Sequence, residues 1–559
     1  MPQPAAALID NQGRRFQFER AGQFFSAADL LFPCGMGVQM SRMSPLLAFS
    51  LLASVLCIDP VRAEQFRVIP RPVRIEAGQG SFIVSGRTVI MSRAADSSVA
   101  EYLRRCLGRK TGFEPALAVM SGPEKPEPGT IVLMTSPPGE RPGREAYELR
   151  VTPDRVTAKA SGPEGLFYAC QTLLQLLEQS GQNTGDSTWS LPAVTIEDAP
   201  RFPWRGLMID CSRTFQSLAY LERYIDLLAR YKLNVLHLHL TDDQGWRVEI
   251  GKYSELTRIG AKFAPQYDKA SGYYTQQQIR ELVRYGSDRQ LKIVPEIEMP
   301  GHCLAALASY PWLSCTGERF EIYPFFKGPG IQENVFCAGN EATFEFLEGV
   351  LEEVANLFPC EFVHIGGDEV PKVRWKNCPK CRERMKAEGL RDENELQSWF
   401  VRRIEKILEA RGKRLIGWDE ILEGGLAPRA TVMSWRGMEG GIQAVRQGHD
   451  VVMSPTSHCY LDYTHEETSV KEAYSFEPVP DGFDREKAGH VLGLQGNIWT
   501  HIAVTEPETD RQVFPRLIAL AEVAWSPAAA RDWESFCARL QPQLAELKAL
   551  GVSYYENWR

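Results

Sequence analysis

Two adjacent carboxylates, Asp368 and Glu369, follow a pair of glycines at the end of a short apolar run. Along an extended strand end their side chains would point in different directions, and the glycines would let a ligand approach the backbone closely. Tryptophans end three further apolar runs, at Trp418, Trp435 and Trp499. Carboxyl groups transfer protons and indole faces pack on sugar rings, so this combination is typical of glycosidic bond cleavage.

Other chemistries find less support in the residues. The chain has no serine nucleophile elbow followed by the other members of a triad, and no glycine-rich phosphate loop after a strand. Its 71 acidic and 63 basic residues give a net charge of -8, without a dense block of lysine and arginine. This balance argues against a nucleic-acid or anionic-membrane partner.

Eight short apolar runs, separated mostly by amphipathic helical patterns, would position these side chains. Near-continuous apolar strands that alternate with helices predict a parallel sheet covered on both faces. Eight such units favour an α/β fold of the (β/α)₈ TIM barrel type, in which the strand ends share one mouth, over a doubly wound open sheet. The predicted strands are 206–211, 235–240, 292–298, 362–367, 414–418, 431–435, 451–455 and 491–499, with clear helices at 218–231, 276–289 and 343–358.

The remaining residues divide into three segments around the barrel. Residues 64–199 alternate short strand patterns with two helical ones and predict a small α+β domain. The acidic and proline residues at 197–200 mark its boundary, so the barrel is expected over 200–527 and a C-terminal helical extension over 528–559. Residues 1–63 are expected to be an upstream extension and a signal peptide.

The stretch from Pro45 to Ile58 is apolar but too short to cross a membrane as a helix. Arg42 precedes it and a small-residue cleavage site ends at Ala63, which is the pattern of a signal peptide; a buried helix is the alternative. Cys57 lacks the small preceding residue of a lipoprotein anchor. We therefore expect export, either to the periplasm or out of the cell, without a membrane anchor.

The cysteines admit several arrangements. Two of the 13, Cys34 and Cys57, lie before Ala63, so eleven remain and at least one is unpaired within a monomer. Cys378 and Cys381 form a single C-x-x-C, whereas a zinc knuckle needs a second such pair. A local disulfide or two free thiols are therefore favoured there, and a bridge between Cys315 and Cys337 stays open.

The motifs at the strand ends resemble those of one family. DCSR from Asp210, HLHLTDDQGWR from His237, PEIEMPGH from Pro295 and HIGGDE from His364, in this order, closely resemble glycoside hydrolase family 20, the β-N-acetylhexosaminidases. The resemblance extends from about Gln65 to the end and includes the family's small α+β domain. It implies an exo-acting, retaining hydrolase that needs no cofactor or metal and releases terminal N-acetyl-β-glucosamine, or N-acetylgalactosamine, from glycans.

The resemblance also implies catalytic roles. The substrate's own acetamide oxygen would attack C1 and give an oxazolinium ion, the exception to the two-carboxylate scheme. By position, Glu369 matches the general acid/base and Asp368 the residue that orients the acetamide N–H. Tyr460 matches the group that hydrogen-bonds the acetamide oxygen. Asp242 and His302 match a relay to Glu369 that tunes its pKa.

Further positions match the substrate pocket. Arg213 and Asp462 correspond to groups that bind the sugar hydroxyls, and the acetamide pocket would be walled by Trp418, Trp435 and Trp499. Two positions depart from the family pattern. Thr214 stands where histidine is common, and His501 stands where an acidic residue contacts the terminal sugar. We place His501 in the substrate site, but its presence leaves the gluco or galacto preference open.

Four alternatives remain at this stage. A zinc-dependent amidohydrolase barrel would use His237 and His239, with His302 and His364 recruited, although the late-strand His–Asp set of that class is not evident. A conventional double-displacement glycosidase would use Glu420 or Asp462 as nucleophile. A glycan-binding protein on an inactive barrel, and an enzyme of this family that releases a disaccharide such as lacto-N-biose, are the other two. The natural glycan and the oligomeric state stay open.

Overall fold

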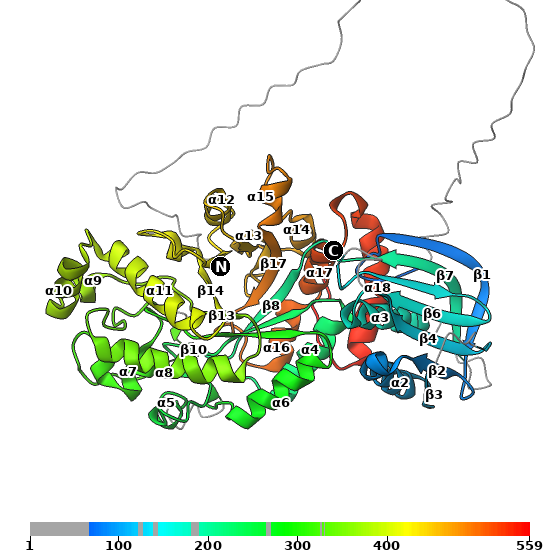
Figure 1. The fold of residues 1–559 in the computed structure, drawn as a ribbon, viewed down its shortest axis with the longest axis horizontal. Helices are drawn as coiled ribbons and strands as arrows, with labels where there is room; N and C mark the ends of the chain where they lie inside the picture. Colours follow the sequence, from blue (N-terminus) through cyan, green and yellow to red (C-terminus); the bar gives the residue numbers. More distant parts are fainter. Residues whose placement is uncertain are drawn as a thin grey trace, which may run out of the picture. The chain divides into compact units, whose positions relative to one another are not determined.

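The computed structural model describes residues 66–120, 127–137, 143–179, 189–263, 270–324, 327–328 and 330–559. The described residues belong to one compact unit, in which a sheet domain is joined to a barrel (Figure 1). The predicted signal peptide, including Pro45 to Ile58, lies outside the described residues. Within the described residues, no helix has the length and apolar character needed to cross a membrane.

Eight parallel strands close into a barrel, as the sequence predicts. Each strand pairs with the next along the chain, and the last pairs back onto the first, so the doubly wound alternative is wrong. The strands are β8 (Trp204–Asp210), β9 (Val235–His239), β12 (Lys292–Glu296), β13 (Phe362–His364), β14 (Arg414–Trp418), β15 (Thr431–Ser434), β16 (Val451–Met453) and β17 (Val491–Ile498).

Amphipathic helices cover the outside of the barrel. Their ends follow local signals: Ser217 accepts a hydrogen bond from the backbone of the first turn of α4 (Leu218–Arg230), and Thr275 with Gln278 forms a capping box at α6 (Gln276–Ser287). The other covering helices include α8 (Glu341–Leu357), α11 (Glu393–Glu409), α12 (Glu439–Arg446), α16 (Glu506–Val513) and α17 (Arg516–Trp525).

The barrel interior is filled rather than hollow. One cluster of buried side chains includes Trp204, Val294, Phe362 and Trp418. Trp435 and Trp499 are partly buried and pack against this cluster. A second, larger cluster lies between the strands and the surrounding helices. The tryptophans that end the apolar runs therefore cap the packed interior at the carboxyl ends of the strands.

The first domain is a mixed seven-stranded sheet with two long helices. The strand order is β1 (Arg74–Val84), β7 (Trp189–Asp198), β5 (Tyr147–Val151), β6 (Arg155–Ala160), β4 (Thr130–Thr135), β2 (Val89–Ser92) and β3 (Ala116–Val119). Apolar residues of α2 (Ser97–Thr111) and α3 (Pro163–Gln179) share one core with the sheet. This arrangement is the α+β domain that the sequence predicts.

A buried ion pair joins the two parts of the chain. The Lys232 ammonium, just after α4, lies 2.8 Å from the carboxylate of Asp198 at the end of β7, and both side chains are fully buried. Tyr147 and Trp525 also donate hydrogen bonds to Asp198. The C-terminal helix α18 (Trp533–Ala549) packs at the same junction, where Arg539 pairs with Glu522 of α17.

The eleven cysteines of the described residues are all free thiols. Neither a Cys378–Cys381 disulfide nor a Cys315–Cys337 bridge is formed. Of the two arrangements predicted for the C-x-x-C, free thiols are observed. The sulfur atoms of Cys378 and Cys381 lie close to those of Cys315 and Cys337.

Candidate active site

A cavity of about 490 Å³ opens at the carboxyl ends of the barrel strands. Its size is within the usual range for small-molecule sites. Ten of the side chains proposed from the sequence line it, and Asp242 lies directly behind His302. The lining consists of Arg213, His302, Gly330, Ile331, Asp368, Glu369, Trp418, Trp435, Tyr460, Asp462, Tyr463, Trp499 and His501.

Four aromatic rings form one wall of the cavity. Tyr460 is stacked on Trp435 with ring centroids 6.0 Å apart, and Trp499 lies 6.4 Å from Tyr460 and 6.1 Å from Trp418. The backbone of Tyr460 bridges to Asn497 of β17, which fixes the loop that carries it. Such a wall excludes water and presents flat apolar faces to a ligand.

Glu296 is a buried carboxylate beneath this wall. The Trp418 indole donates a 2.8 Å hydrogen bond to it, and nitrogens of His237, His239 and His364 lie between 2.5 and 3.1 Å from its oxygens. Burial alone would raise the pKa of Glu296, but the three imidazoles hold it well below its ordinary value. Three of the four histidines of the zinc-amidohydrolase alternative, His237, His239 and His364, thus surround a carboxylate, and the Glu296 network fixes the orientation of Trp418.

The Asp368–Glu369 pair does not follow an extended strand end. β13 stops at His364, and Gly366, Gly367 and Glu369 all adopt positive φ values, of 66°, 92° and 47°. This backbone turns both carboxylates toward His302, whose Nε2 lies 3.6 Å from Asp368 and 3.5 Å from Glu369. The expectation that the two side chains diverge is therefore wrong, because the left-handed turn replaces strand alternation.

Packing within the protein also requires glycine at both positions of this pair. A Cβ atom on Gly366 would lie only 1.6 Å from a carboxyl oxygen of Glu298. On Gly367 it would approach the Ile421 side chain at 2.6 Å. The glycines therefore make room for the protein's own side chains.

His302 connects the acid pair to the buried carboxylates behind it. Its Nδ1 lies 3.3 Å from Asp242 and 3.4 Å from Asp243, while its Nε2 faces Asp368 and Glu369. Burial lowers the pKa of His302, but the charges of Asp242 and Asp368 outweigh burial and raise it well above its ordinary value. A protonated imidazole at this place favours the ionised form of Asp368.

Arg213 is held rigidly by its neighbours. Its guanidinium lies 2.6 Å from Asp242 and 3.6 Å from Asp210, and it packs over the Trp499 ring. Asp210 also accepts hydrogen bonds from the backbone N–H groups of Ser212 and Arg213. This positions the remaining guanidinium N–H groups at the cavity for polar ligand atoms.

Asp462 and His501 lie at the cavity with unused hydrogen-bonding capacity. Asp462 Oδ1 and His501 Nδ1 have no hydrogen-bond partner among the described residues. Burial raises the pKa of Asp462 to about 7, and burial together with the Arg213 charge lowers that of His501. Both side chains are therefore available to a ligand.

The two positions that depart from the family pattern lie together. The Thr214 backbone N–H donates to the Thr500 hydroxyl, and the Thr214 hydroxyl donates to the Thr500 carbonyl. This double contact ties the loop after β8 to the loop after β17, immediately beside His501. The departures at Thr214 and His501 thus affect one edge of the cavity.

The environment separates the two cavity carboxylates of the acid pair. Asp368 is buried, and burial followed by the nearby Glu296, Glu369 and Asp242 charges raises its pKa to about 6, against the opposing effect of His302. The Glu369 side chain is 36% exposed. A half-exposed carboxyl beside a buried one suits the first for proton exchange with a leaving group and the second for holding a ligand N–H or a developing positive charge.

Two glutamates of the site, Glu296 and Glu298, receive no role from the sequence, whereas Glu420 is named there only as an alternative nucleophile. Glu296 is the last residue of β12, Glu298 follows two residues later, and both are buried. Burial and the Asp368 charge raise the pKa of Glu298 well above its ordinary value. Glu420 accepts a hydrogen bond from the Trp435 indole, and burial with the Asp368 charge raises its pKa to about 8. Charged residues at alternate positions of an apolar run were the available signal.

Two family models match the chain. Residues 202–528 match Glycosyl hydrolase family 20, catalytic domain, and residues 65–199 match Glycosyl hydrolase family 20, domain 2. The first match covers the whole barrel, and the second covers the sheet domain.

Individual relatives agree with these matches. A beta-hexosaminidase of Porphyromonas gingivalis is 41% identical over 506 residues, which cover 87% of this chain and 64% of the relative. A beta-hexosaminidase of Vibrio furnissii is 36% identical, with 83% and 77% covered. The crystal structure of the exo beta-N-acetylglucosaminidase of Vibrio harveyi with N-acetylglucosamine is similar with a TM-score of 0.78 and 33% identity, over 89% of this chain and 79% of that one. The chain therefore spans less than two thirds of the Porphyromonas relative.

Proposed function

The chain belongs to glycosyl hydrolase family 20, and from this premise we propose that it is an exo-acting, retaining β-N-acetylhexosaminidase. The substrate would be a glycan with a terminal non-reducing N-acetyl-β-glucosamine or N-acetylgalactosamine. The reaction would proceed through an oxazolinium ion formed by the substrate's acetamide. No cofactor is needed for these steps.

The aromatic wall supports the first step. Trp418, Trp435 and Trp499 would enclose the acetamide and press its oxygen toward C1, with the Tyr460 hydroxyl donating to that oxygen. For well-oriented groups, intramolecular attack is worth up to about 7–11 kcal/mol relative to a bimolecular one. The hydrogen bonds from the Trp418 and Trp435 indoles to Glu296 and Glu420 keep the wall in place before substrate arrives.

The acid pair would carry the proton and the charge. Glu369 would protonate the departing glycosidic oxygen and later deprotonate the water that opens the oxazolinium ring. Asp368 would accept the acetamide N–H and stabilise the positive charge as it develops on the ring. His302, held by Asp242, positions both carboxylates and supplies positive charge when they are ionised.

The rest of the cavity would bind the terminal sugar. Arg213 and Asp462 offer a donor and an acceptor to its hydroxyls, and His501 offers a ring nitrogen at the edge tied by Thr214 and Thr500. Because His501 replaces an acidic residue of the family pattern, it is the group we expect to influence the choice between gluco and galacto sugars.

One observation carries the proposal: Asp368 and Glu369 converge on His302 at a cavity walled by four aromatic rings. This arrangement has a proton donor and a charge-stabilising carboxylate on one side and a water-excluding surface on the other. A conventional double-displacement enzyme would need a free nucleophile, and Glu420 instead accepts the Trp435 indole N–H.

The test compares aryl glycosides that differ in one group. We expect turnover of an aryl N-acetyl-β-glucosaminide, inhibition by an oxazoline-mimicking thiazoline, and almost no turnover of the matching aryl β-glucoside, which lacks the acetamide. Equal rates on both substrates would indicate a protein nucleophile such as Asp462 and reject acetamide participation. Release of lacto-N-biose from an aryl lacto-N-bioside, without release of a single N-acetylhexosamine from the aryl N-acetylhexosaminides, would instead assign a disaccharide product.

We also propose that the chain is exported, on the strength of the apolar stretch at 45–58 and the small-residue site at Ala63. Mass spectrometry of the N-terminus of the protein recovered from outside the cytoplasm should give a mature chain that starts shortly after Ala63. An uncleaved chain confined to the cytoplasm would contradict this.

A further inference from the structure

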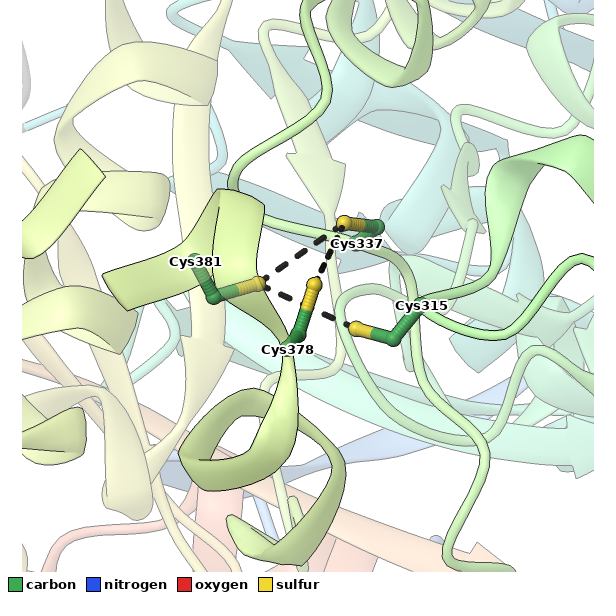
Figure 2. A group of neighbouring side chains, drawn as sticks. All are labelled: Cys315, Cys337, Cys378 and Cys381. Carbon is green, nitrogen blue, oxygen red and sulfur yellow. Dashed lines mark hydrogen bonds between the residues drawn. The ribbon is translucent and has the colours of Figure 1, made fainter. Parts of the chain in front are cut away.

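Four cysteines from three separate segments converge at one point outside the active site (Figure 2). Cys315 follows a short helical turn, Cys337 lies before α8, and Cys378 and Cys381 lie at the start of α10 (Pro379–Glu388). All four Sγ atoms lie within 4.8 Å of one another, and three of the side chains are buried. Figure 2 shows the four side chains pointing toward a common centre.

The spacing of the sulfur atoms is that of a metal-binding tetrahedron rather than of disulfides. Cys337 Sγ lies 3.8 Å from Cys378 and 3.7 Å from Cys381, and Cys381 lies 3.8 Å from Cys315. Four sulfurs around a zinc ion at about 2.3 Å are separated from one another by about 3.8 Å. A disulfide needs about 2.05 Å, and Cys337, with two equally near neighbours, does not single out a partner.

The surrounding backbone is built to hold this arrangement. A Cβ atom on Gly339 would lie 2.2 Å from the Lys380 carbonyl carbon and 2.4 Å from the Cys381 nitrogen, so the Cys337 loop rests directly on the C-x-x-C turn. The Cys337 N–H donates to the Leu313 carbonyl, which brings the Cys315 segment alongside. In the segment that carries the C-x-x-C, the Trp375 indole donates a hydrogen bond to the carbonyl of Phe336, the residue before Cys337.

We propose that these four cysteines bind one structural Zn²⁺ ion as a closed Cys₄ site. On binding, the four thiols would release their protons to solvent and the thiolates would occupy every coordination position, so the ion would have no open position for catalysis. The complex would carry a net charge of -2. The segment 374–386 around the C-x-x-C is basic in sequence, with one acidic residue, Glu383, against six basic ones: Arg374, Lys376, Lys380, Arg382, Arg384 and Lys386.

The ion would join the two loops that carry the proposed acid and its partner. The loop after β12 contains His302, and the Phe336 N–H, next to Cys337, donates to the Pro300 carbonyl two residues before His302. The segment after β13 contains Glu369 and runs on to Cys378. Zinc binding itself does not depend on the proposed hexosaminidase activity, and it is measured without any substrate.

The C-x-x-C was judged insufficient for zinc from the sequence because no second such pair exists. The structure replaces that pair by Cys315 and Cys337, which are distant in sequence but adjacent in space. Of the two arrangements expected for the C-x-x-C, a local disulfide or two free thiols, the free thiols are observed, with Cys315 and Cys337 beside them.

Metal analysis of the full chain, purified without chelator or reductant, tests the proposal directly. We expect about one zinc per chain, and X-ray absorption should give four sulfur ligands at about 2.3 Å. Replacement by Co²⁺ should produce the sulfur-to-metal charge-transfer band and visible bands of a tetrahedral thiolate site. These measurements need no variant, so they stand even where substitutions impair folding.

Variants then locate the ion. Cys381→Ser should lose most of the zinc and lower the melting temperature by about 5 °C or more, because a ligand of the native state is lost. Cys360→Ser, another buried thiol of the same barrel, should retain the metal. Two disulfides among the four cysteines, a wild-type chain that does not take up zinc, or full zinc retention in Cys381→Ser would each overturn the proposal.

Discussion

The Nε2 atom of His302 lies 3.5 Å from the carboxylate of Glu369, while Nδ1 of the same ring lies 3.3 Å from Asp242. One buried imidazole therefore stands between a buried carboxylate, Asp242, and a partly exposed one, Glu369, at the cavity. Through His302, the charge state of the cavity therefore depends on Asp242, which lies behind the cavity wall.

Glu369→Gln removes the proposed proton donor while keeping the size of the side chain. We expect kcat/KM to fall by about 10²- to 10⁴-fold for a glycoside with a poor leaving group, because that group must be protonated as it departs. For a dinitrophenyl glycoside the fall should be much smaller, because this leaving group departs without a proton.

The measurement is a series of aryl N-acetyl-β-glucosaminides of increasing leaving-group pKa. The variant should show a steeper dependence of rate on leaving-group pKa than the wild type. An equal loss across the series would assign Glu369 to binding instead of proton transfer.

The activity should have an acid limb near pH 6, which reports Asp368. The pKa of Asp368 is raised to about 6, so its carboxyl group is ionised above that pH. Below that pH it is protonated and can no longer stabilise positive charge on the substrate. Because the His302 charge lowers this pKa, His302→Gln should move the acid limb of kcat/KM to higher pH. A pH profile of kcat/KM for both proteins on one substrate checks this. An acid limb at the same pH in the variant would show that His302 does not set the pKa of Asp368.

His501→Ala should raise KM about tenfold, because the variant lacks a cavity nitrogen that has no protein partner and that we expect to hydrogen-bond the substrate. The effect on kcat should be smaller, and the ratio of kcat/KM for paired gluco and galacto aryl substrates should change. His490→Ala, where the histidine pairs with Asp450 outside the cavity, serves as control. An unchanged KM and ratio would remove His501 from the substrate site.

Asp198→Asn should destabilise the fold by about 3–5 kcal/mol, because it leaves the fully buried Lys232 ammonium without its partner. Urea denaturation followed by tryptophan fluorescence measures the change in the free energy of unfolding. Glu76→Gln, which breaks a solvent-exposed pair with Arg74, should leave the midpoint near that of the wild type. Equal midpoints for all three proteins would show that the pair at the domain junction contributes little.

Local patterns determined most of the architecture. Apolar runs separated by amphipathic helices specified eight strands in order, and the observed strands lie within a few residues of the predicted ones. The parallel barrel then required the residues after those strands to share one mouth, so Trp418, Trp435 and Trp499 could be placed together before any coordinates. Hydrophobic periodicity is a short-range property, and it is written directly in the residue order.

Tertiary structure decided the features that depend on distant neighbours and on backbone turns. Gly366, Gly367 and Glu369 all have positive φ, and Gly366 packs against Glu298; strand alternation gives no indication of this. Cys315 and Cys337 meet the C-x-x-C only because the loops after two neighbouring strands fold onto each other. Residue order fixes which groups reach the mouth of the barrel, but long-range packing fixes where their atoms point.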